Sequence, residues 1–348
     1  MLGWNATKLE CLLIADDLTG ACDAAVHFAR RGYRTHVRLH SHGEEVSVLA
    51  ISAESRHLSA AQLRPVMDEL AQRLPVARAR ILFKKIDSTL RGNVGSEIAA
   101  ARTAFGCETA VITPAFPAMG RIVEEGYLRV AGAEAIHLPA RLGLDPCLHV
   151  QPSSVYAAIQ AGARFISVDA TSDRDLDTIA AAGLESGRRI LWAGSAGLSS
   201  ALARTLPWGG PGPRPAPRPA SSVLFCIGSD HPVTVEQQRN LLALRRRECV
   251  VLNLSIGQTS LERARHLILN AADGATALVL SGGDTASLVC RALGVRRIQL
   301  EDEILPGIPW GYLSGGAFDR SRVATKSGGF GAPHALIQVA DFFTCPTP

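Results

Sequence analysis

Lysine is scarce in this sequence of 348 residues: of its 36 basic residues, four are lysines and 32 are arginines. Lysine carries a compact point charge, whereas arginine presents a planar fork of donors, so the two are not interchangeable where a binding site needs one of them. The positions that keep lysine are therefore the first candidates for a specific role, and they are Lys8, Lys84, Lys85 and Lys326.

The chain also lacks a strong excess of charge, since its net charge of +4 arises from 36 basic and 32 acidic residues. Aromatic residues make up only 5% and do not alternate with basic ones, as they do in proteins that bind single-stranded nucleic acid. No apolar run reaches the ~18 residues of a membrane-spanning helix, and the N-terminal segment has no signal-peptide pattern. We therefore expect a cytoplasmic protein that binds neither nucleic acid nor membranes.

Motifs for disulfides, metals and serine nucleophiles are missing as well. The eight cysteines form no C-x-x-C pair and lie in apolar contexts, which is typical of buried free thiols in a reducing compartment. The histidines nearest to polar segments, His57, His231 and His334, have no zinc-ligand spacing. The segment Gly194-Ser195-Ala196-Gly197 is not a G-x-S-x-G nucleophile elbow. A zinc enzyme and a serine hydrolase are thus disfavoured.

A proline-rich boundary divides the chain. Residues 207–220 hold six prolines and three glycines in fourteen positions, and such a stretch acts as a semi-rigid spacer rather than as part of a core. It predicts an N-terminal domain over residues 1–206, a linker over 207–220 and a C-terminal domain over 221–348.

Short apolar runs alternate with helical patterns in both halves. In the first half, strands are expected at 11–15, 35–39, 46–51, 80–85, 109–113, 164–168 and 189–193, and helices at 21–31, 60–73 and 94–104. In the second half, strands are expected at 223–227, 249–254 and 277–280, and helices at 232–247, at 261–272 and up to 293. The alternation predicts two α/β domains, each a mainly parallel sheet with flanking helices. Ligands of such sheets bind at the carboxyl ends of the strands.

Two polar segments follow strands of the first half. Asp16-Asp17-Leu18-Thr19-Gly20-Ala21 opens a helix, and adjacent carboxylates there can bind a hydroxyl, act as a base or hold Mg²⁺, although one of them would suffice as a helix cap. Lys84–Asn93 contains three cations, a carboxylate and two hydroxyls, which suit an anionic, polyhydroxylated ligand. Arg56, after another strand, adds a bidentate partner for a carboxylate. Scattered surface ion pairs are the alternative explanation.

Three glycine-rich segments lie in the second half. Gly282-Gly283-Asp284-Thr285 lies between a strand and a helix, where backbone N–H groups can approach phosphate oxygens. Gly228-Ser229-Asp230 follows another strand, and Lys326–Gly331 lies near the C-terminus, where its glycines permit tight approach of the backbone. Each segment alone could be a tight turn, but three of them in one small domain favour a phosphate site. None of them matches G-x-x-x-x-G-K-[ST] or G-x-G-x-x-G.

Taken together, six motifs resemble the four-carbon acid-sugar kinase family. They span nearly the whole chain and occur in this order: Asp16–Ala21 (DDLTGA), Lys84–Gly92 (KKIDSTLRG), Pro117–Arg121 (PAMGR), Ala193–Leu198 (AGSAGL), Gly282–Thr285 (GGDT) and Lys326–Gly331 (KSGGFG). The resemblance implies a two-domain enzyme whose N-terminal domain holds threonate, erythronate or 3-oxo-tetronate and whose C-terminal domain holds ATP with Mg²⁺. The terminal hydroxyl of the acid sugar is then phosphorylated in the interdomain cleft.

The resemblance also implies roles for individual residues. The acid-sugar site is expected to contain Asp16, Asp17, Arg56, Lys84, Lys85, Asp87, Ser88 and Arg91. The nucleotide site is expected to contain Ser229, Gly282, Gly283, Asp284, Thr285, Lys326, Gly328 and Gly329. Asp17 or Asp87 would accept the proton of the attacking hydroxyl, and Lys326 would be a mobile cation near the phosphates. The metal ligands stay unassigned, and the short second half predicts a reduced adenine pocket.

Two other classes of protein fit parts of this pattern. A non-catalytic protein with two lobes could bind an acid sugar and a nucleotide without turnover, although a pure binder has no need of three glycine-rich segments. A nucleotide-linked dehydrogenase is disfavoured because the G-x-G-x-x-G fingerprint is missing. The sequence leaves the identity and stereochemistry of the acid sugar open, and it leaves a homodimer as the candidate oligomer, since homodimers are common among soluble enzymes.

Overall fold

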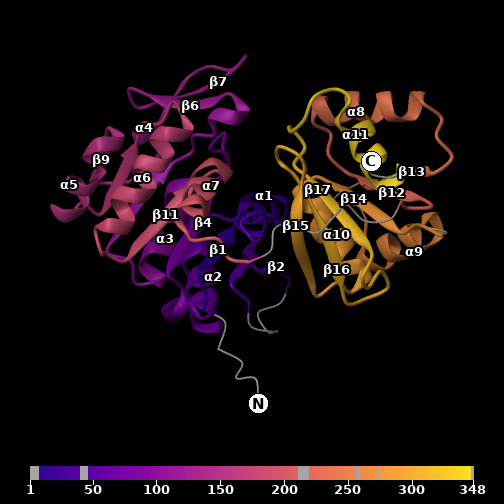
Figure 1. Ribbon diagram of the computed structural model, residues 1–348, viewed down its shortest axis with the longest axis horizontal. Helices are drawn as coiled ribbons and strands as arrows, with labels where there is room; N and C mark the ends of the chain where they lie inside the picture. Colours follow the sequence, from indigo (N-terminus) through magenta and orange to yellow (C-terminus); the bar gives the residue numbers. More distant parts are fainter. Residues whose placement is uncertain are drawn as a thin grey trace. The chain divides into compact units, whose positions relative to one another are not determined.

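The computed structural model describes residues 8–39, 46–210, 219–255, 257, 259–272 and 274–345. The chain folds into two compact units, which Figure 1 shows. Unit 1 comprises residues 1–16 and 41–210, and unit 2 comprises residues 17–40 and 211–348. The chain therefore first passes from one unit to the other between Asp16 and Asp17.

This division differs from the predicted one in a single segment, residues 17–40. Residues 17–40 were expected to belong with the N-terminal domain, but they pack with the C-terminal unit. The last passage between the units, at residues 210 and 211, falls within the proline-rich segment. Of that segment, residues 211–218 lie outside the described residues, so their predicted spacer role stays a prediction.

Unit 1 is built on a sheet whose described strands all pair in parallel. The strands follow the order β3 (Val48–Ser52), β1 (Cys11–Ala15), β4 (Ile81–Lys85), β11 (Ile190–Gly194), β5 (Thr109–Thr113), β10 (Phe165–Val168) and β9 (Cys147–Val150). The strand β1 is apolar and buried along its whole length, as expected for a sheet covered on both faces. Because β1 lies between β3 and β4, the segments that follow these strands are neighbours at the carboxyl edge of the sheet.

Helices and a smaller sheet complete unit 1. The helices are α2 (Ala60–Arg73), α3 (Val94–Ala104), α4 (Leu138–Leu142), α5 (Val155–Gln160), α6 (Asp173–Glu185) and α7 (Ala196–Thr205). An antiparallel sheet contains β6 (Arg121–Glu124), β7 (Tyr127–Val130) and β8 (Ile136–His137). Ser172 begins α6 with a capping box, in which its hydroxyl and the carboxylate of Asp175 each accept a backbone N–H of the other residue.

Unit 2 has a mixed sheet. Its strands follow the order β13 (Cys249–Asn253), β12 (Val223–Ile227), β14 (Ala277–Ser281), β17 (Arg322–Lys326), β16 (Ile308–Ser314), β15 (Arg297–Leu305) and β2 (Thr35–Arg38). The first four pair in parallel, and the pairs from β17 to β2 are antiparallel. Its helices are α1 (Leu18–Ala29), α8 (Pro232–Ala243), α9 (Leu261–Ala271), α10 (Gly283–Leu293) and α11 (Ala335–Thr344).

The helices of unit 2 lie in two groups. One hydrophobic cluster joins α8 and α11 to the sheet through buried residues that include Phe225, Trp310, Leu336 and Phe343. The helix α1 packs instead with α10, β2 and β15. All twelve residues of α1 are buried. The segment of residues 17–40 therefore contributes a core helix to unit 2.

The predicted fold class is confirmed, because both units are α/β and most strands pair in parallel. The strands β15 and β16 were not predicted, since Gly307 and Pro309 read as breaks in a strand. In the structure, Gly307 forms the turn between the two strands with φ of 76°. Pro309 pairs with Glu303 next to a register shift of the ladder, where a residue without an N–H is tolerated.

Gly95 marks a close approach of two helices in unit 1. A Cβ atom at this position of α3 would overlap the backbone carbonyl of Leu142 in α4. Alanine favours helix formation over glycine by about 1 kcal/mol, but a clash with backbone outweighs that gain. We expect Gly95→Ala to lower the Tm by about 5–10 °C, as measured by circular dichroism. The matched substitution Ser96→Ala on the same helix should leave the Tm nearly unchanged, and a Gly95→Ala protein as stable as wild type would contradict the packing described.

Candidate functional site

Charged side chains meet at the carboxyl edge of the sheet in unit 1. Asp16 directly follows β1, Arg56 lies in the loop after β3, and Asp87 follows β4. The Nε and Nη2 atoms of Arg56 each lie 2.7 Å from Oδ2 of Asp16, and Nη2 lies 3.7 Å from Oδ2 of Asp87. We call these three residues and Arg91 the charged cluster. The structure thus brings together four residues that the sequence placed in one site.

The carboxylate of Asp87 has its acceptor positions filled. Its Oδ1 accepts the backbone N–H of Thr89 at 2.8 Å and the Thr89 hydroxyl at 2.5 Å. Its Oδ2 accepts Nε and Nη2 of Arg91 at 3.0 and 2.6 Å. Burial acts to raise the pKa of Asp87, but the hydrogen bond and charge of Arg91, with Thr89 and Arg56, outweigh it and hold the pKa well below its usual range. Asp87 is therefore a weak base that organises its neighbours.

Asp16 differs from Asp87 in having one oxygen that no described residue contacts by a hydrogen bond. Its side chain is 3% exposed, and Arg56 holds its Oδ2. Its Oδ1 is buried and has no hydrogen-bond partner among the described residues. An unsatisfied buried acceptor costs free energy. A ligand hydroxyl that donates a hydrogen bond to Oδ1 would remove that cost.

The two lysines at the end of β4 differ in their surroundings. Lys84 is fully buried, and its Nζ lies 2.9 Å from the carbonyl oxygen of Lys85 and 3.4 Å from Oε2 of Glu97 in α3. Lys85 is 5% exposed, and its Nζ donates to the carbonyl oxygen of Ile86 at 2.9 Å. Since an ammonium group has three donors, Lys85 keeps donors for a ligand. The charge of Lys84 is paired inside the unit.

Two residues at this edge were not predicted. Arg121 donates a hydrogen bond to the hydroxyl of Ser88, and Glu97 accepts one from the hydroxyl of Ser55. Both are at least nine-tenths buried. Arg121 ends the motif Pro117–Arg121, which signalled a relevant segment but not this contact. No sequence signal marked Glu97, because a glutamate in the first turn of a helix is common for reasons of charge alone.

Three loops of unit 2 meet at the carboxyl edge of its parallel strands. They follow β12, β14 and β17, which are neighbours in the sheet. We call Ser229, Gly282, Gly283, Gly328 and Gly329 the glycine cluster. A Cβ atom on Gly328 would overlap the hydroxyl of Ser229, and one on Gly282 would lie 3.4 Å from Cβ of Ser229. The loops are therefore in direct contact, with the Ser229 side chain packed against the glycine backbone.

The loop after β14 begins α10. Gly282 is the N-terminal cap of this helix and has φ of 106°, a conformation that favours glycine. Its N–H donates to the carbonyl oxygen of Lys326 at 2.9 Å, which ties the loop to β17. Asp284 is exposed and Thr285 is buried in the first turn of the helix. The N-terminus of α10 thus offers backbone N–H groups and a favourable dipole for an anion.

The start of α1 joins the glycine cluster. Asp17 caps α1, with its Oδ1 accepting the N–H of Gly20 at 2.6 Å. Its carboxylate lies where a Cβ atom on Gly283 would be, and the hydroxyl of Thr19 lies 3.1 Å from that of Ser327. Asp17 was predicted in the acid-sugar site, but the structure places it in unit 2 beside the loop that begins α10.

Lys326 has a different environment from the one predicted. Its side chain is fully buried, and burial lowers its pKa to about 7. Its Nζ donates to the carbonyl oxygens of Ser327, Gly328 and Phe330 at 3.0–3.1 Å and lies 3.2 Å from Oγ1 of Thr234. The prediction of a mobile cation is wrong, because these contacts fix the ammonium group inside its own loop.

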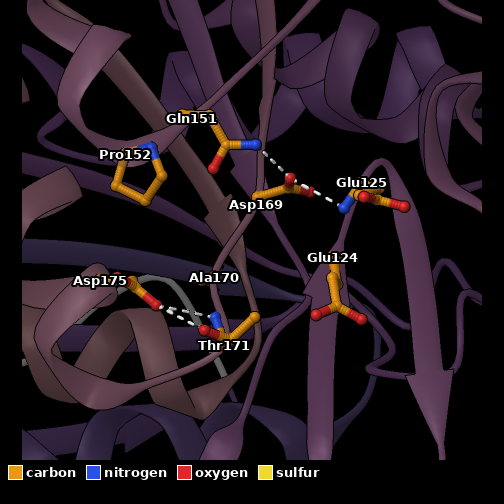
Figure 2. Close-up of a pocket in the computed structure, with 8 residues that line it drawn as sticks. All are labelled: Glu124, Glu125, Gln151, Pro152, Asp169, Ala170, Thr171 and Asp175. Atoms are coloured by element: carbon orange, nitrogen blue, oxygen red, sulfur yellow. Dashed lines mark hydrogen bonds between the residues drawn. The ribbon is translucent and has the colours of Figure 1, made fainter.

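Figure 2 shows a pocket of unit 1 that has a volume of about 260 Å³ and whose lining includes no residue of the charged cluster. Its lining consists of Glu124, Glu125, Gln151, Pro152, Asp169, Ala170, Thr171 and Asp175. Asp169 accepts the backbone N–H of Glu125 and the amide of Gln151, and Asp175 caps α6. Because this lining holds four carboxylates and no basic residue, it disfavours the anionic ligand that the charged cluster suits.

The described residues contain no helix that is long and apolar enough to cross a membrane. Within the same parts of the chain, no three histidine, cysteine, aspartate or glutamate side chains gather in a way that could hold a metal ion. All eight cysteines are free.

Comparison with known protein families finds two family models, one for each half of the chain. Residues 11–142 and 146–202 match a family model described as a sugar-binding N-terminal domain. Residues 229–336 match one described as a nucleotide-binding C-terminal domain. The two matches hold the charged cluster and the glycine cluster respectively.

Curated relatives match nearly the whole chain. The sequence is 33% identical to the D-threonate kinase of Bordetella bronchiseptica, over 94% of this chain and 96% of that protein. It is 27% identical to the D-erythronate kinase of Heliobacterium modesticaldum, over 95% and 96% of the two chains. A solved structure from B. bronchiseptica, described as a domain of unknown function with bound citrate in a domain-swapped dimer, has 32% identity and a TM-score of 0.51 and covers 96% of this chain and 98% of its own.

Proposed function

Because this chain belongs to the four-carbon acid-sugar kinase family, we propose that it transfers the γ-phosphoryl group of ATP to the terminal hydroxyl of a four-carbon acid sugar. Candidate acceptors are threonate, erythronate and 3-oxo-tetronate. In this proposal unit 1 binds the acid sugar and unit 2 binds the nucleotide. The observation that carries it is the presence of an arginine–carboxylate cluster in one unit and of three contacting glycine loops in the other.

The acid sugar has a carboxylate and several hydroxyls, and the charged cluster has groups for both. Arg56 and Lys85 are the cations that we assign to the substrate carboxylate, since both have donor groups at the strand ends. We do not assign Lys84 to the ligand, because Glu97 neutralises it inside unit 1. Ser88 is the hydroxyl-binding candidate, and Arg121 fixes its orientation.

We propose that Asp16 accepts the proton of the attacking hydroxyl. Of the aspartates at the two clusters, Asp87 has its acceptor positions filled and a lowered pKa. Asp17 uses its Oδ1 to cap α1. The Oδ1 atom of Asp16 has no partner among the described residues. A loose transition state for phosphoryl transfer needs orientation of the hydroxyl more than a strong base, and Asp16 can supply it.

The glycine cluster is the proposed site of the ATP phosphates. Backbone N–H groups at the start of α10 and in the loop after β17 neutralise phosphate oxygens without mobile side chains. The missing side chains of Gly283 and Gly328 let the Asp17 and Ser229 side chains pack directly against these loops. The hydroxyl of Ser229 lies against Gly328 and provides a further donor.

ATP enters phosphoryl transfer as its Mg²⁺ complex, and the ion stabilises the negative charge of the phosphates. Such an ion is held mainly by phosphate oxygens and water, with one or two carboxylates of the protein. The carboxylate of Asp17 lies against Gly283 and is the kind of ligand that Mg²⁺ prefers. Asp17 is therefore the residue that fits this ion.

The non-catalytic alternative is set aside. Relatives that match more than nine-tenths of the chain are kinases by name, and the residues that the proposed transfer needs are present in both units. The homodimer predicted from the sequence stays a proposal, which the domain-swapped dimer of the B. bronchiseptica relative supports.

An assay that couples ADP release to NADH oxidation tests the proposal. We expect turnover with at least one of the D- and L-threonates, the D- and L-erythronates and 3-oxo-tetronate, and none with four-carbon acids that lack a terminal hydroxyl, such as succinate. Phosphorus NMR of the product should show a phosphomonoester on the terminal carbon. Folded protein that binds ATP but phosphorylates no member of the panel would overturn the assignment of substrate.

A further inference from the structure

Lys326 is a buried cation that contacts its own loop. The Nζ atom donates to the carbonyl oxygens of Ser327, Gly328 and Phe330 at 3.0, 3.1 and 3.1 Å. The hydroxyl of Thr234 in α8 lies 3.2 Å from Nζ and itself donates to the carbonyl oxygen of Gly328 at 2.6 Å. One ammonium group thus gathers three carbonyl oxygens from four consecutive residues.

These contacts set the direction of the backbone amides. In a trans peptide the C=O and the following N–H point in opposite directions within one plane. Holding the carbonyls of Ser327 and Gly328 toward Nζ therefore turns the N–H groups of Gly328 and Gly329 away from the buried ammonium. A run of N–H groups on one side of a loop is the arrangement that binds an anion.

The backbone of Lys326 also secures the neighbouring loop. Its carbonyl oxygen accepts the N–H of Gly282 at 2.9 Å. Gly282 is the cap of α10, where the second set of anion-binding amides begins. Through its side chain and its main chain, Lys326 is connected to two of the three loops of the glycine cluster.

We infer that Lys326 is a positioning residue of the nucleotide site, which orients the backbone amides that hold the ATP phosphates and does not itself contact the nucleotide. This inference rests on the proposed function and specifies how its phosphate site is built. Lys326 was predicted to contact the phosphates directly. In this inference its charge acts on them only through the peptide groups that it orients.

At position 326 a lysine suits this role better than an arginine, although arginine is the common basic residue of the chain. Three carbonyl oxygens and the Thr234 hydroxyl surround one point, which suits a compact ammonium group, whereas a guanidinium group spreads its donors over a plane. Burial lowers the pKa of Lys326 to about 7. Above that pH the amine has two donors and no charge, so the loop loses one of its contacts.

Binding of ADP by isothermal titration calorimetry tests the inference, with Lys326→Met as the main variant. We expect the Kd for ADP to rise about tenfold to a hundredfold, since hydrogen bonds from a charged group to the loop are lost. The Kd for the acid sugar should stay at the wild-type value, because the charged cluster belongs to the other unit. A general loss of structure would weaken both ligands.

A milder pair of variants covers the case in which Lys326→Met does not fold. Thr234→Val removes the hydroxyl that contacts both Nζ and Gly328, and we expect a rise in the Kd for ADP of about threefold to tenfold. Thr344→Val is the matched control, because this hydroxyl donates to the backbone carbonyl of Ala340 in α11 of the same unit. Its Kd for ADP should equal that of wild type.

A pH series adds a readout that a purely structural role would not change. Between about pH 6 and pH 9 the wild-type Kd for ADP should rise as Lys326 loses its proton, whereas Lys326→Arg stays charged and should give a flatter profile. The titratable groups on the adjoining helices, Asp17, His231 and Asp284, are common to both proteins.

Two results would be decisive against the inference. Wild-type affinity for ADP in folded Lys326→Met, or in Thr234→Val if the first variant does not fold, rejects it and leaves the proposed kinase intact. Failure of the wild-type protein to bind ADP or ATP would reject the proposed function and the inference together.

Discussion

An Asp16→Asn enzyme is expected to lose about a hundredfold or more in kcat, the range that a positioned proton acceptor contributes, while its KM for ATP stays close to the wild-type value. Steady-state kinetics with the acid sugar that the wild-type enzyme phosphorylates fastest measures both constants. Asparagine has the shape of aspartate, and its amide oxygen can still accept the hydrogen bonds of Arg56. The substitution therefore removes the charge of the proton acceptor without opening the cluster.

The matched control is Asp87→Asn, which makes the same change of carboxylate to amide at the aspartate that follows β4. Asp87 holds Arg91 and Thr89 in place, and its acceptor positions are filled. We expect this variant to raise the KM for the acid sugar, with a smaller effect on kcat than Asp16→Asn has. A larger fall in kcat for Asp87→Asn than for Asp16→Asn would reverse the assignment and favour the base that the sequence suggested.

Gly283→Ala is expected to weaken ADP binding about a hundredfold, because the new Cβ atom would occupy the position of the Asp17 carboxylate. Relief requires a shift of the start of α10 or a rotation of Asp17 away from the cap of α1. Overpacking costs about 1–3 kcal/mol, and loss of an aspartate cap costs about 0.5–2 kcal/mol. Calorimetric titration with ADP in the absence of Mg²⁺ measures the effect on the loop alone.

A double-mutant cycle separates the clash from other effects of the added methyl group. In an Asp17→Ala background the obstructing carboxylate is gone, so Gly283→Ala should cost much less affinity than it does in the wild-type protein. Equal costs in the two backgrounds would show that the two residues are not in contact. Unchanged ADP affinity in Gly283→Ala itself would remove this loop from the nucleotide site.

The strand ends were predictable because the physics that defines them is local. A buried parallel strand is a short apolar run, and the polar residues after it mark the carboxyl edge of the sheet. Asp16, Asp87, Ser229 and Gly282 follow such runs, and the structure places each of them at that edge. The sequence could also assign them to two groups, since the proline-rich segment divides the chain between the second and third of them.

The functions of the charged side chains were less predictable, because they depend on partners far away in the sequence. Lys326 stood out as a rare lysine next to glycines, but the folding of its own loop turns it inward to three carbonyl oxygens. Asp16 and Asp17 have the same local sequence context, yet one pairs with Arg56 and the other lies against Gly283. Nothing in the hydrophobic pattern of residues 17–40 showed that they pack with a sheet formed almost 200 residues later.

Because residues 17–40 belong to unit 2, the protein cannot be divided into two complete domains by a single cut. Proteolysis or truncation at the proline-rich segment would not yield two complete domains, because the C-terminal fragment would lack β2 and α1. Without α1, apolar side chains of α10 and β15 would be exposed to water, and the fragment would also lose the Asp17 cap that lies beside its glycine cluster. Unit 2 is therefore encoded in two separate stretches of the chain, and synthesis of the C-terminal stretch comes last.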